Sequence, residues 1–206
     1  MTLREQQKER GRELIRAAAE ELFLRGGYTG TPVTAIAEKA GVAEKTVYNL
    51  FQTKSRLLLD VFRNRALGQG DDSLQLDHEK IHSLDDPEEM IDLFCETNEK
   101  VASRAIPLLR VVLEAAAVDT EVAALVAAQE QFRYQHQAYL LHALLRLGHL
   151  RTDQPFEELQ RSLWLAVAPE LCIKAIDAGW DLKRQTEWNK QVLRALLLPG
   201  PSAPRT

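Results

Sequence analysis

A row of side chains able to hydrogen-bond the edges of DNA bases stands in the second half of the segment Val33–Phe51. The spacing of apolar residues predicts that this half is a short helix, the second of a helix-turn-helix, with the row facing outward. Such a helix fits the major groove of double-stranded DNA, where outward side chains meet bases and phosphates. The outward residues are Glu44, Lys45, Thr46, Tyr48 and Asn49.

The other residues of this segment have the sizes that two closely crossing helices require. Ala37 is small where the first helix must approach the second, and Gly41 supplies the positive φ of the turn between them. Ile36 faces inward on the first helix, and Val47 faces inward on the second. An ordinary helical hairpin with a glycine turn is the alternative interpretation of this pattern.

A second pattern could bind a metal ion. The stretch from His78 to His82 matches H-E-x-x-H, in which two histidines one helical turn apart bind zinc and the glutamate, here Glu79, acts as a base. That chemistry also requires a third ligand and a cleft, whereas the surrounding segment, residues 68–86, is polar and has little apolar face. We therefore predict no metal site, and a metal-dependent protein using these residues stays a lesser alternative.

Charge is divided unevenly along the chain. Its 206 residues carry a net charge of −4, but residues 1–65 hold 12 Lys and Arg against 8 Asp and Glu, a net of +4. Residues 66–206 hold 14 against 22, a net of −8. The positive end is the one that contains the helix-turn-helix, where the release of counterions from phosphates favours binding.

The composition indicates a cytoplasmic globular protein. Hydrophobic residues make up 45% and charged residues 27%, and no apolar run reaches the roughly 18 residues that a membrane helix needs. No secretory signal is visible in the polar first residues. Cys95 and Cys172 lie too far apart in the sequence to form a metal-ligand pair. No nucleophile elbow, phosphate-binding glycine loop or C-x-x-C pair is present, so we predict no enzyme, no catalytic residue and no cofactor.

Helical periodicity predicts an all-α fold. In the N-terminal part we expect a first helix that begins within residues 4–12 and ends at Arg25, and a second that ends near Ala40, with Thr31 as its N-cap and Pro32 at its first position. A third covers about 43–51, and Thr53 caps a fourth over about 54–66.

The remaining chain is predicted to consist mainly of long helices. A loop with a partly ordered middle covers 68–86, and Pro169 should kink its helix and free the carbonyl near Leu165. The helices are expected at about 87–103, 106–118, 120–147, 155–178 and 181–198. We assign residues 1–53 to a three-helix DNA-binding domain, 54–198 to a helical ligand-binding and dimerisation domain, and 199–206 to a disordered tail.

The stretch from Arg12 to Leu58 resembles the tetracycline-repressor (TetR) family of bacterial regulators. The resemblance is carried, in order, by the sequences IRAAAEELFLRGGY, TPVTAIAEKAGV, TVYNLF and TKSRLL. The rest of the chain matches that family only in plan, as a helical region of suitable length. The resemblance implies a homodimer that binds a palindromic DNA operator, most simply as a repressor, and leaves it when a small-molecule effector binds.

The resemblance also implies contacts for particular residues. Tyr48 and Lys54 would contact phosphates, the first by a hydrogen bond and the second as a point charge. Lys45 is chemically suited to guanine and Asn49 to adenine, while Glu44 could accept a hydrogen bond from cytosine or repel wrong sites. Further contacts to the DNA backbone are expected from Thr31, Thr34 and Thr46.

The sequence departs from the usual pattern of the family in two places. Ala43 stands where the recognition helix often begins with Ser or Thr, so its side-chain cap is missing. Asn49-Leu50 replaces the aromatic or histidine pair common there. Both departures affect the operator sequence and not the mode of binding.

In this family the C-terminal helices form the dimer, and the sequence agrees in kind. The run LWLAVAPELCIKAI within 155–178 is too apolar for one buried stripe, and the last helix is also rich in apolar residues. Packing as a four-helix bundle with a second chain would cover them, and the alternative is one unusually well-buried core helix. The interface residues we expect are Leu163, Leu171, Trp188, Val192 and Leu196.

The effector pocket is predicted from polar and aromatic residues embedded in apolar helices. Arg110 and Glu114 lie one turn apart, so they could pair with each other and with a ligand. The full set is Asn98, Arg110, Glu114, Phe132, His136, Tyr139, Trp164 and Glu170, and for each the alternative is a satisfied core group or a surface position. A dimeric helical ligand-binding protein without DNA binding is the rival function, which the presence of Tyr48 and Lys54 disfavours.

Overall fold

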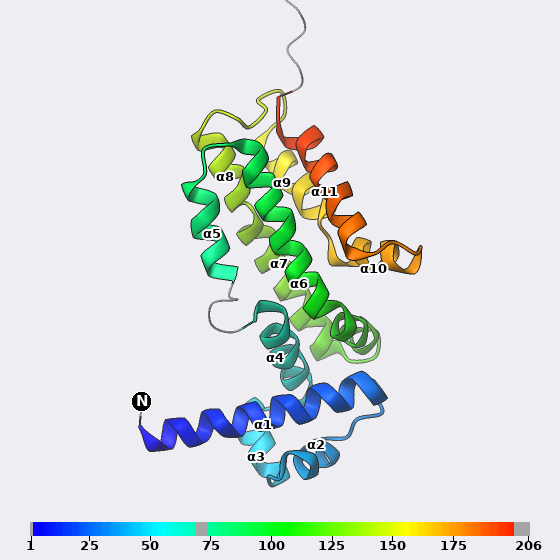
Figure 1. Ribbon diagram of the computed structural model, residues 1–206. Helices are drawn as coiled ribbons and strands as arrows, with labels where there is room; N and C mark the ends of the chain where they lie inside the picture. Colours follow the sequence, from blue (N-terminus) through cyan, green and yellow to red (C-terminus); the bar gives the residue numbers. More distant parts are fainter. Residues whose placement is uncertain (1, 69–73, 200–206) are drawn as a thin grey trace, which may run out of the picture. The chain divides into compact units, whose positions relative to one another are not determined.

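The computed structural model describes residues 2–68 and 74–199, and within these ranges every regular element is a helix. This confirms the predicted all-α fold class. Most of the predicted tail, from Gly200 onward, lies outside the described residues. The helices are α1 Leu3–Gly26, α2 Val33–Ala40, α3 Glu44–Phe51, α4 Lys54–Leu67, α5 Leu74–Ser83, α6 Pro87–Ala116, α7 Thr120–Gln137, α8 Tyr139–Arg146, α9 Phe156–Ala166, α10 Pro169–Asp177 and α11 Leu182–Leu197 (Figure 1).

Contacts between residues divide the chain into two compact units. The first, which we call the head, contains the chain up to Ala66 together with Ala105–Gln129. The second, which we call the body, contains Leu67–Arg104 and the chain from Glu130 onward. The functional division into 1–53 and 54–198 stays a prediction.

The head has a core to which the first four helices and the α6–α7 region contribute. On α1, Ile15, Ala19 and Phe23 are fully buried because apolar residues recur at helical spacing along one side. Gly41 ends α2 in the left-handed conformation, with a φ of 68°, as its place in the turn predicts. From α6 and α7 the same core takes Leu108, Val111, Val112, Ala115 and Val122.

The start of α2 differs from the prediction. Thr31 is not its N-cap, because Pro32 occupies that position and no side chain caps the helix. The Thr31 hydroxyl instead donates to the carbonyls of Leu22 and Gly27, at 3.1 and 2.8 Å, and is buried. These hydrogen bonds join the segment before α2 to the C-terminal end of α1. Thr53 does cap α4, accepting from the Arg56 amide at 3.1 Å.

Three predicted helix boundaries after residue 86 differ from those of the structure. The predicted break between 103 and 106 is absent, because α6 runs through Pro107 and buries Leu108 just beyond it. The predicted helix 120–147 is divided at Ala138 into α7 and α8. The predicted helix 155–178 is not kinked but interrupted, since Pro169 is the first residue of the separate helix α10. The Leu165 carbonyl is therefore not free and accepts from the Ala168 amide at 3.1 Å.

The body has its own apolar core, and ion pairs join two of the helices around it. Fully buried residues come from α6, α8, α9 and α11, for example Phe94, Leu141 and Leu193. At the edge of the core the buried Lys190 of α11 pairs with Glu96 of α6 at 3.1 Å. The predicted loop 68–86 contains α5 in its middle, where partial order was expected.

Candidate DNA-binding surface and effector region

The outer side of α3 carries side chains that are free to bind. Lys45, Tyr48 and Asn49 are exposed, and among the described residues none hydrogen-bonds to their side chains. Val47 and Phe51 are buried in the head core and fix the rotation of the helix. The helix-turn-helix geometry that the sequence predicted is therefore present, with its polar row directed outward.

The other predicted DNA contacts lie in different surroundings. Glu44 and Thr46 are half-buried on α3, and Thr34 is exposed on α2. Ala43 begins α3 without a side-chain cap, as predicted. Thr31 is only 3% exposed and its hydroxyl donates to carbonyls within the head, so we leave it out of the proposed contacts.

A strained turn joins α3 to α4. Within residues 2–68 and 74–199, Gln52 is the one non-glycine residue with a positive φ, at 70°. Its ψ is −56°, and the amide of Thr53 donates to the carbonyl of Phe51 at 2.8 Å across it. This is a γ-turn, a conformation that costs a residue with a side chain about 1 to 3 kcal/mol. The turn places Lys54 at the start of α4, directly after the recognition helix.

Replacing Gln52 by glycine should raise the free energy of unfolding by about 1 kcal/mol. Glycine removes the strain of the positive φ, and this gain exceeds the entropy that glycine adds to the unfolded chain. Urea denaturation followed by circular dichroism measures the difference. Gln52→Ala is the matched control, because it removes the same amide but keeps the strain. A glycine variant no more stable than the alanine variant would contradict the account.

Lys54 is held against an aromatic ring. Its ammonium lies 4.2 Å from the centroid of the Tyr28 ring, within the range of a cation–π contact. Burial lowers the pKa of Lys54, and the charge of Asp119 acts in the opposite direction. The side chain is half-buried, so its charge stands at one place beside α3 rather than moving freely.

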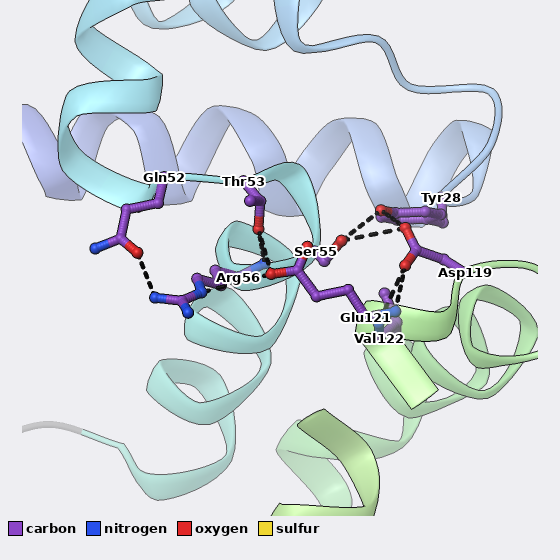
Figure 2. A network of polar contacts seen from close by, with 8 residues as sticks. All are labelled: Tyr28, Gln52, Thr53, Ser55, Arg56, Asp119, Glu121 and Val122. Carbon is purple, nitrogen blue, oxygen red and sulfur yellow. Dashed lines mark hydrogen bonds and ion pairs between the residues drawn. The ribbon is translucent and has the colours of Figure 1, made fainter. Parts of the chain in front are cut away.

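Tyr28 is in turn anchored by Asp119, at the start of α7. Figure 2 shows the Tyr28 hydroxyl directed at this carboxylate, to which it donates at 2.6 Å. The Ser55 hydroxyl donates to the same carboxylate oxygen at 3.1 Å. The other carboxylate oxygen accepts from the amides of Glu121 and Val122 at 2.9 and 3.1 Å. Burial raises the pKa of Tyr28 to about 12, and the hydrogen bond from Tyr28 lowers the pKa of Asp119.

A parallel set of contacts runs through Glu121. The Thr53 hydroxyl donates to its carboxylate at 3.1 Å, and the Arg56 guanidinium lies 3.5 Å from the same oxygen (Figure 2). Arg56 also donates to the side-chain oxygen of Gln52. The start of α4 is thus joined to the start of α7 by two acids. Sequence analysis did not single out Asp119 or Glu121, because their partners lie more than sixty residues away.

Residues 15–61 match the family model described as bacterial regulatory proteins, tetR family. The stretch that contains the helix-turn-helix is therefore similar to the DNA-binding part of the TetR family. No curated protein sequence matched the chain.

Solved structures of the same fold extend over nearly the whole chain. SmeT bound to triclosan has a TM-score of 0.70 at 18% identity, covering 95% of this chain and 97% of that one. SmeT described as the repressor of the Stenotrophomonas maltophilia multidrug efflux pump SmeDEF gives 0.68 at 22% identity, covering 91% and 90%. FadR from Bacillus subtilis with stearoyl-CoA gives 0.68 at 19% identity, covering 90% and 97%. The chain as a whole therefore has the fold of these regulators.

The predicted effector residues are distributed over several places. Two of them, Arg110 and Glu114, are exposed on the part of α6 that belongs to the head, and so are not embedded as predicted. In the body, Asn98 donates to the carbonyl of Phe94, and the ring of Phe94 lies 5.6 Å from that of Tyr139. Glu170 is half-buried at the start of α10.

Two predicted residues form a pair on the surface of α7. The rings of Phe132 and His136 are stacked with centroids 3.5 Å apart, and Phe132 is 52% exposed. His136 is also exposed, and its ring nitrogen lies 2.9 Å from the carbonyl of Phe132. Both correspond to the surface alternative rather than to embedded residues.

Trp164 has the one orphaned polar atom. Among the described residues, its indole Nε1 is the one buried side-chain nitrogen or oxygen without a hydrogen-bond partner. The Arg133 guanidinium lies 5.1 Å above the ring and donates to the Trp164 carbonyl at 3.2 Å, and Tyr134 packs edge-on at 6.1 Å. The prediction missed Arg133 and Tyr134, although the run Phe132-Arg133-Tyr134 was a signal available in the sequence.

The expected dimer residues divide into one core residue and four at the surface. Leu163 is fully buried in the body core, so we leave it out of the proposed dimer contacts. Leu171 and Trp188 are 39% and 38% exposed, while Val192 and Leu196 are half-buried. Leu165, which the prediction missed, is 55% exposed.

The metal alternative gains no support. Within the described residues, no three His, Cys, Asp or Glu side chains are grouped so that they could hold a metal ion. Glu79 is exposed, and the side chain of His78 lies outside what is described. The described part of the chain also contains no helix long and apolar enough to cross a membrane.

Proposed function

We propose that this chain is a cytoplasmic, ligand-responsive transcription regulator without enzymatic activity. As a homodimer it binds a palindromic operator, most simply as a repressor that a small molecule releases. The observation that carries the proposal is the outer side of α3, where Lys45, Tyr48 and Asn49 are exposed and unpaired while Val47 and Phe51 are buried beneath them. Because the tight turn at Gly41 sets α3 behind α2, these three side chains stand on the side that a recognition helix presents to the major groove.

Each side chain in the proposed surface has one kind of target. Lys45 and Asn49 would contact base edges, with Glu44 selecting against other bases. Tyr48, Lys54, Thr34 and Thr46 would contact the DNA backbone and set the register. The exposed apolar residues of α9 to α11, led by Leu165, Leu171 and Trp188, would meet a second chain, with Val192 and Leu196 at the edge of the contact. Two heads would then read half-sites about one helical turn apart.

Selection of bound duplexes from a random pool tests this proposal. We expect a two-fold symmetric sequence whose half-sites are centred about 10 base pairs apart or a multiple of that. A gel shift at low salt with the selected duplex confirms binding. If no duplex is enriched or shifted, with or without cell extract, the rival interpretation of a helical ligand-binding dimer without DNA binding is favoured instead.

We place one anchor of the effector at Trp164. Its buried Nε1–H has no acceptor among the described residues, and an unpaired buried donor costs about 1 to 3 kcal/mol. An effector oxygen placed there would remove that cost, so the proposed ligand is a mainly apolar molecule with an acceptor atom. The ligands named for the similar structures, triclosan and stearoyl-CoA among them, differ too much to indicate which.

Replacing Trp164 by phenylalanine should weaken the effector response about tenfold while leaving DNA binding unchanged. The substitution keeps an aromatic ring and removes only the donor, which is worth about 1.4 kcal/mol at a tenfold effect. The measurement is the concentration of a releasing compound, found by screening apolar compounds with a carbonyl or hydroxyl group, that frees half of the selected duplex. Trp180→Phe is the matched control, because Trp180 is a tryptophan of the body that belongs to neither the proposed effector anchor nor the proposed dimer contacts. Equal sensitivity of the two variants would remove Trp164 from the site.

A further inference from the structure

The first turns of α1 are an extension that the family match does not cover. The matched stretch begins at Ile15, whereas α1 begins at Leu3. Figure 1 shows these first turns, in dark blue, running past the end of α3. Residues 2–10 are all exposed, so this part of the helix is not stabilised by packing against the rest of the head. We call residues 3–12 the arm.

The arm is built to stay helical although nothing packs against most of it. At its start Thr2 and Glu5 form a complete capping box, with the Glu5 amide donating to the Thr2 hydroxyl and the Thr2 amide donating to the Glu5 carboxylate at 2.7 Å. A polar helical segment this short is marginal on its own, so it depends on the cap and on the helix that continues it. The arm therefore has a fixed direction.

The C-terminal end of the arm contacts the recognition helix α3. The Arg12 guanidinium donates to the Leu50 carbonyl at 3.0 Å and lies 5.2 Å above the ring of Phe51. A side chain added at Gly11 would meet Leu50 at 3.7 Å. Both contacts are to the last turn of α3, so the side of α1 that carries positions 11 and 12 is the side that faces α3.

Two cations continue that side along the arm. At about 3.6 residues per turn, Arg4 and Lys8 fall in line with Gly11 and Ile15, the positions that face the head core. The side of α1 that is apolar and buried at Ile15 is therefore basic and exposed at Arg4 and Lys8. No described residue pairs with Arg4 or Lys8, while the acids of the arm are occupied, Glu5 in the cap and Glu9 with Arg16 at 2.9 Å.

We infer that Arg4 and Lys8 contact phosphates of the DNA beyond the bases that α3 reads. Arg4 lies about 12 Å along the helix from Arg12, a distance that corresponds to about three base pairs. The inference rests on the proposed function, since it extends the surface of the same half-site. The arm would add affinity and salt dependence but no base specificity, because its targets are phosphates.

Arg4→Gln/Lys8→Gln tests the arm in the full chain, with the duplex recovered by selection as the probe. Between 50 and 200 mM salt we expect wild type to lose roughly a hundredfold more affinity than the double variant, because the two arms of the dimer together lose four phosphate contacts. Hydroxyl-radical footprinting should show protection shortened by about three base pairs at the outer end of each half-site. Both side chains are exposed, so circular dichroism should be unchanged.

Arg10→Gln is the matched control, since Arg10 belongs to the same arm but lies on its opposite side. A loss per charge equal to that of the double variant would mean a general effect of net charge and would overturn the oriented contact. A double variant with the salt dependence and footprint of wild type would overturn it as well. A wild-type chain that binds no duplex would overturn the regulator itself and the arm contact with it, a result distinct from both.

Discussion

Asp119→Ala is expected to lower the free energy of unfolding by about 3 kcal/mol. Its carboxylate caps α7 through two amides, and losing such a cap costs about 1 kcal/mol. It also accepts the hydrogen bond of the Tyr28 hydroxyl at 2.6 Å, and a hydrogen bond to a charged group is worth about 2 kcal/mol. Since Tyr28 supports Lys54, we expect DNA affinity to fall as well.

Urea denaturation of Asp119→Ala beside Asp119→Asn measures this. Asparagine keeps one oxygen for the amides of the cap, and its NH2 group stands where the second carboxylate oxygen was and can donate to the Tyr28 hydroxyl. It removes the charge, so it should lose only about 1 kcal/mol. A third variant, Tyr28→Phe, removes the hydroxyl alone and should fall between the two. If alanine and asparagine were equally destabilising, the contribution would come from charge and not from the hydrogen bonds described.

Acid and alkali should act on this pair in opposite directions. The pKa of Asp119 is lowered in the folded chain, so its contribution is present above its ordinary pKa and is lost as the pH falls through the folded value. The pKa of Tyr28 is raised to about 12, so its contribution is present below its ordinary pKa near 10 and is lost as the pH rises through about 12. Asp119→Asn should flatten the first dependence, and Tyr28→Phe the second.

Variants of the DNA surface should separate into two groups. Tyr48→Phe and Lys54→Ala are expected to weaken binding by about tenfold on every duplex, because each removes a phosphate contact. For Lys54→Ala the slope of log affinity against log salt should also fall by about 1.8, because the dimer loses two phosphate contacts. Asn49→Ala should instead change the preference at particular positions, where a lost base contact is worth about 1 to 3 kcal/mol.

Repeating the selection with each variant distinguishes the groups. The first two variants should return the wild-type sequence at lower yield, and Asn49→Ala should return a sequence relaxed at one position of each half-site. Thr34→Val is a milder control on the neighbouring helix. If all three principal variants changed the selected sequence in the same way, the division between phosphate and base contacts would be wrong.

Local patterns were sufficient to predict the helix-turn-helix. The small Ala37, the turn at Gly41 and the inward Val47 are neighbours within one short segment, so their spacing alone determines how the two helices cross. The missing cap at Ala43 was also visible, because capping depends on one side chain and the next turn. Thr31 failed for the opposite reason: its hydroxyl satisfies carbonyls four and nine residues earlier.

Contacts across long stretches of sequence could not be predicted. Tyr28 and Asp119 are ninety-one residues apart, and nothing in either neighbourhood marks the pair. Trp164 was a candidate as an aromatic residue in an apolar helix, but its orphaned nitrogen depends on how α7 packs against α9. The continuity of α6 through Pro107 likewise depends on packing, which outweighs the local preference of proline to end a helix.

The composition of the head core determines how such regulators can be recombined. Five of its buried residues, from Leu108 to Val122, belong to α6 and α7. A chimaera that transplants residues 1–66 onto a foreign body would therefore set α1 and α4 against side chains that never packed with them. Residues 105–129 have to travel with the head, so the junctions of a working graft fall inside α6 and inside α7. Transfer of the head to another regulator would therefore require two separate segments of this chain, residues 1–66 and 105–129.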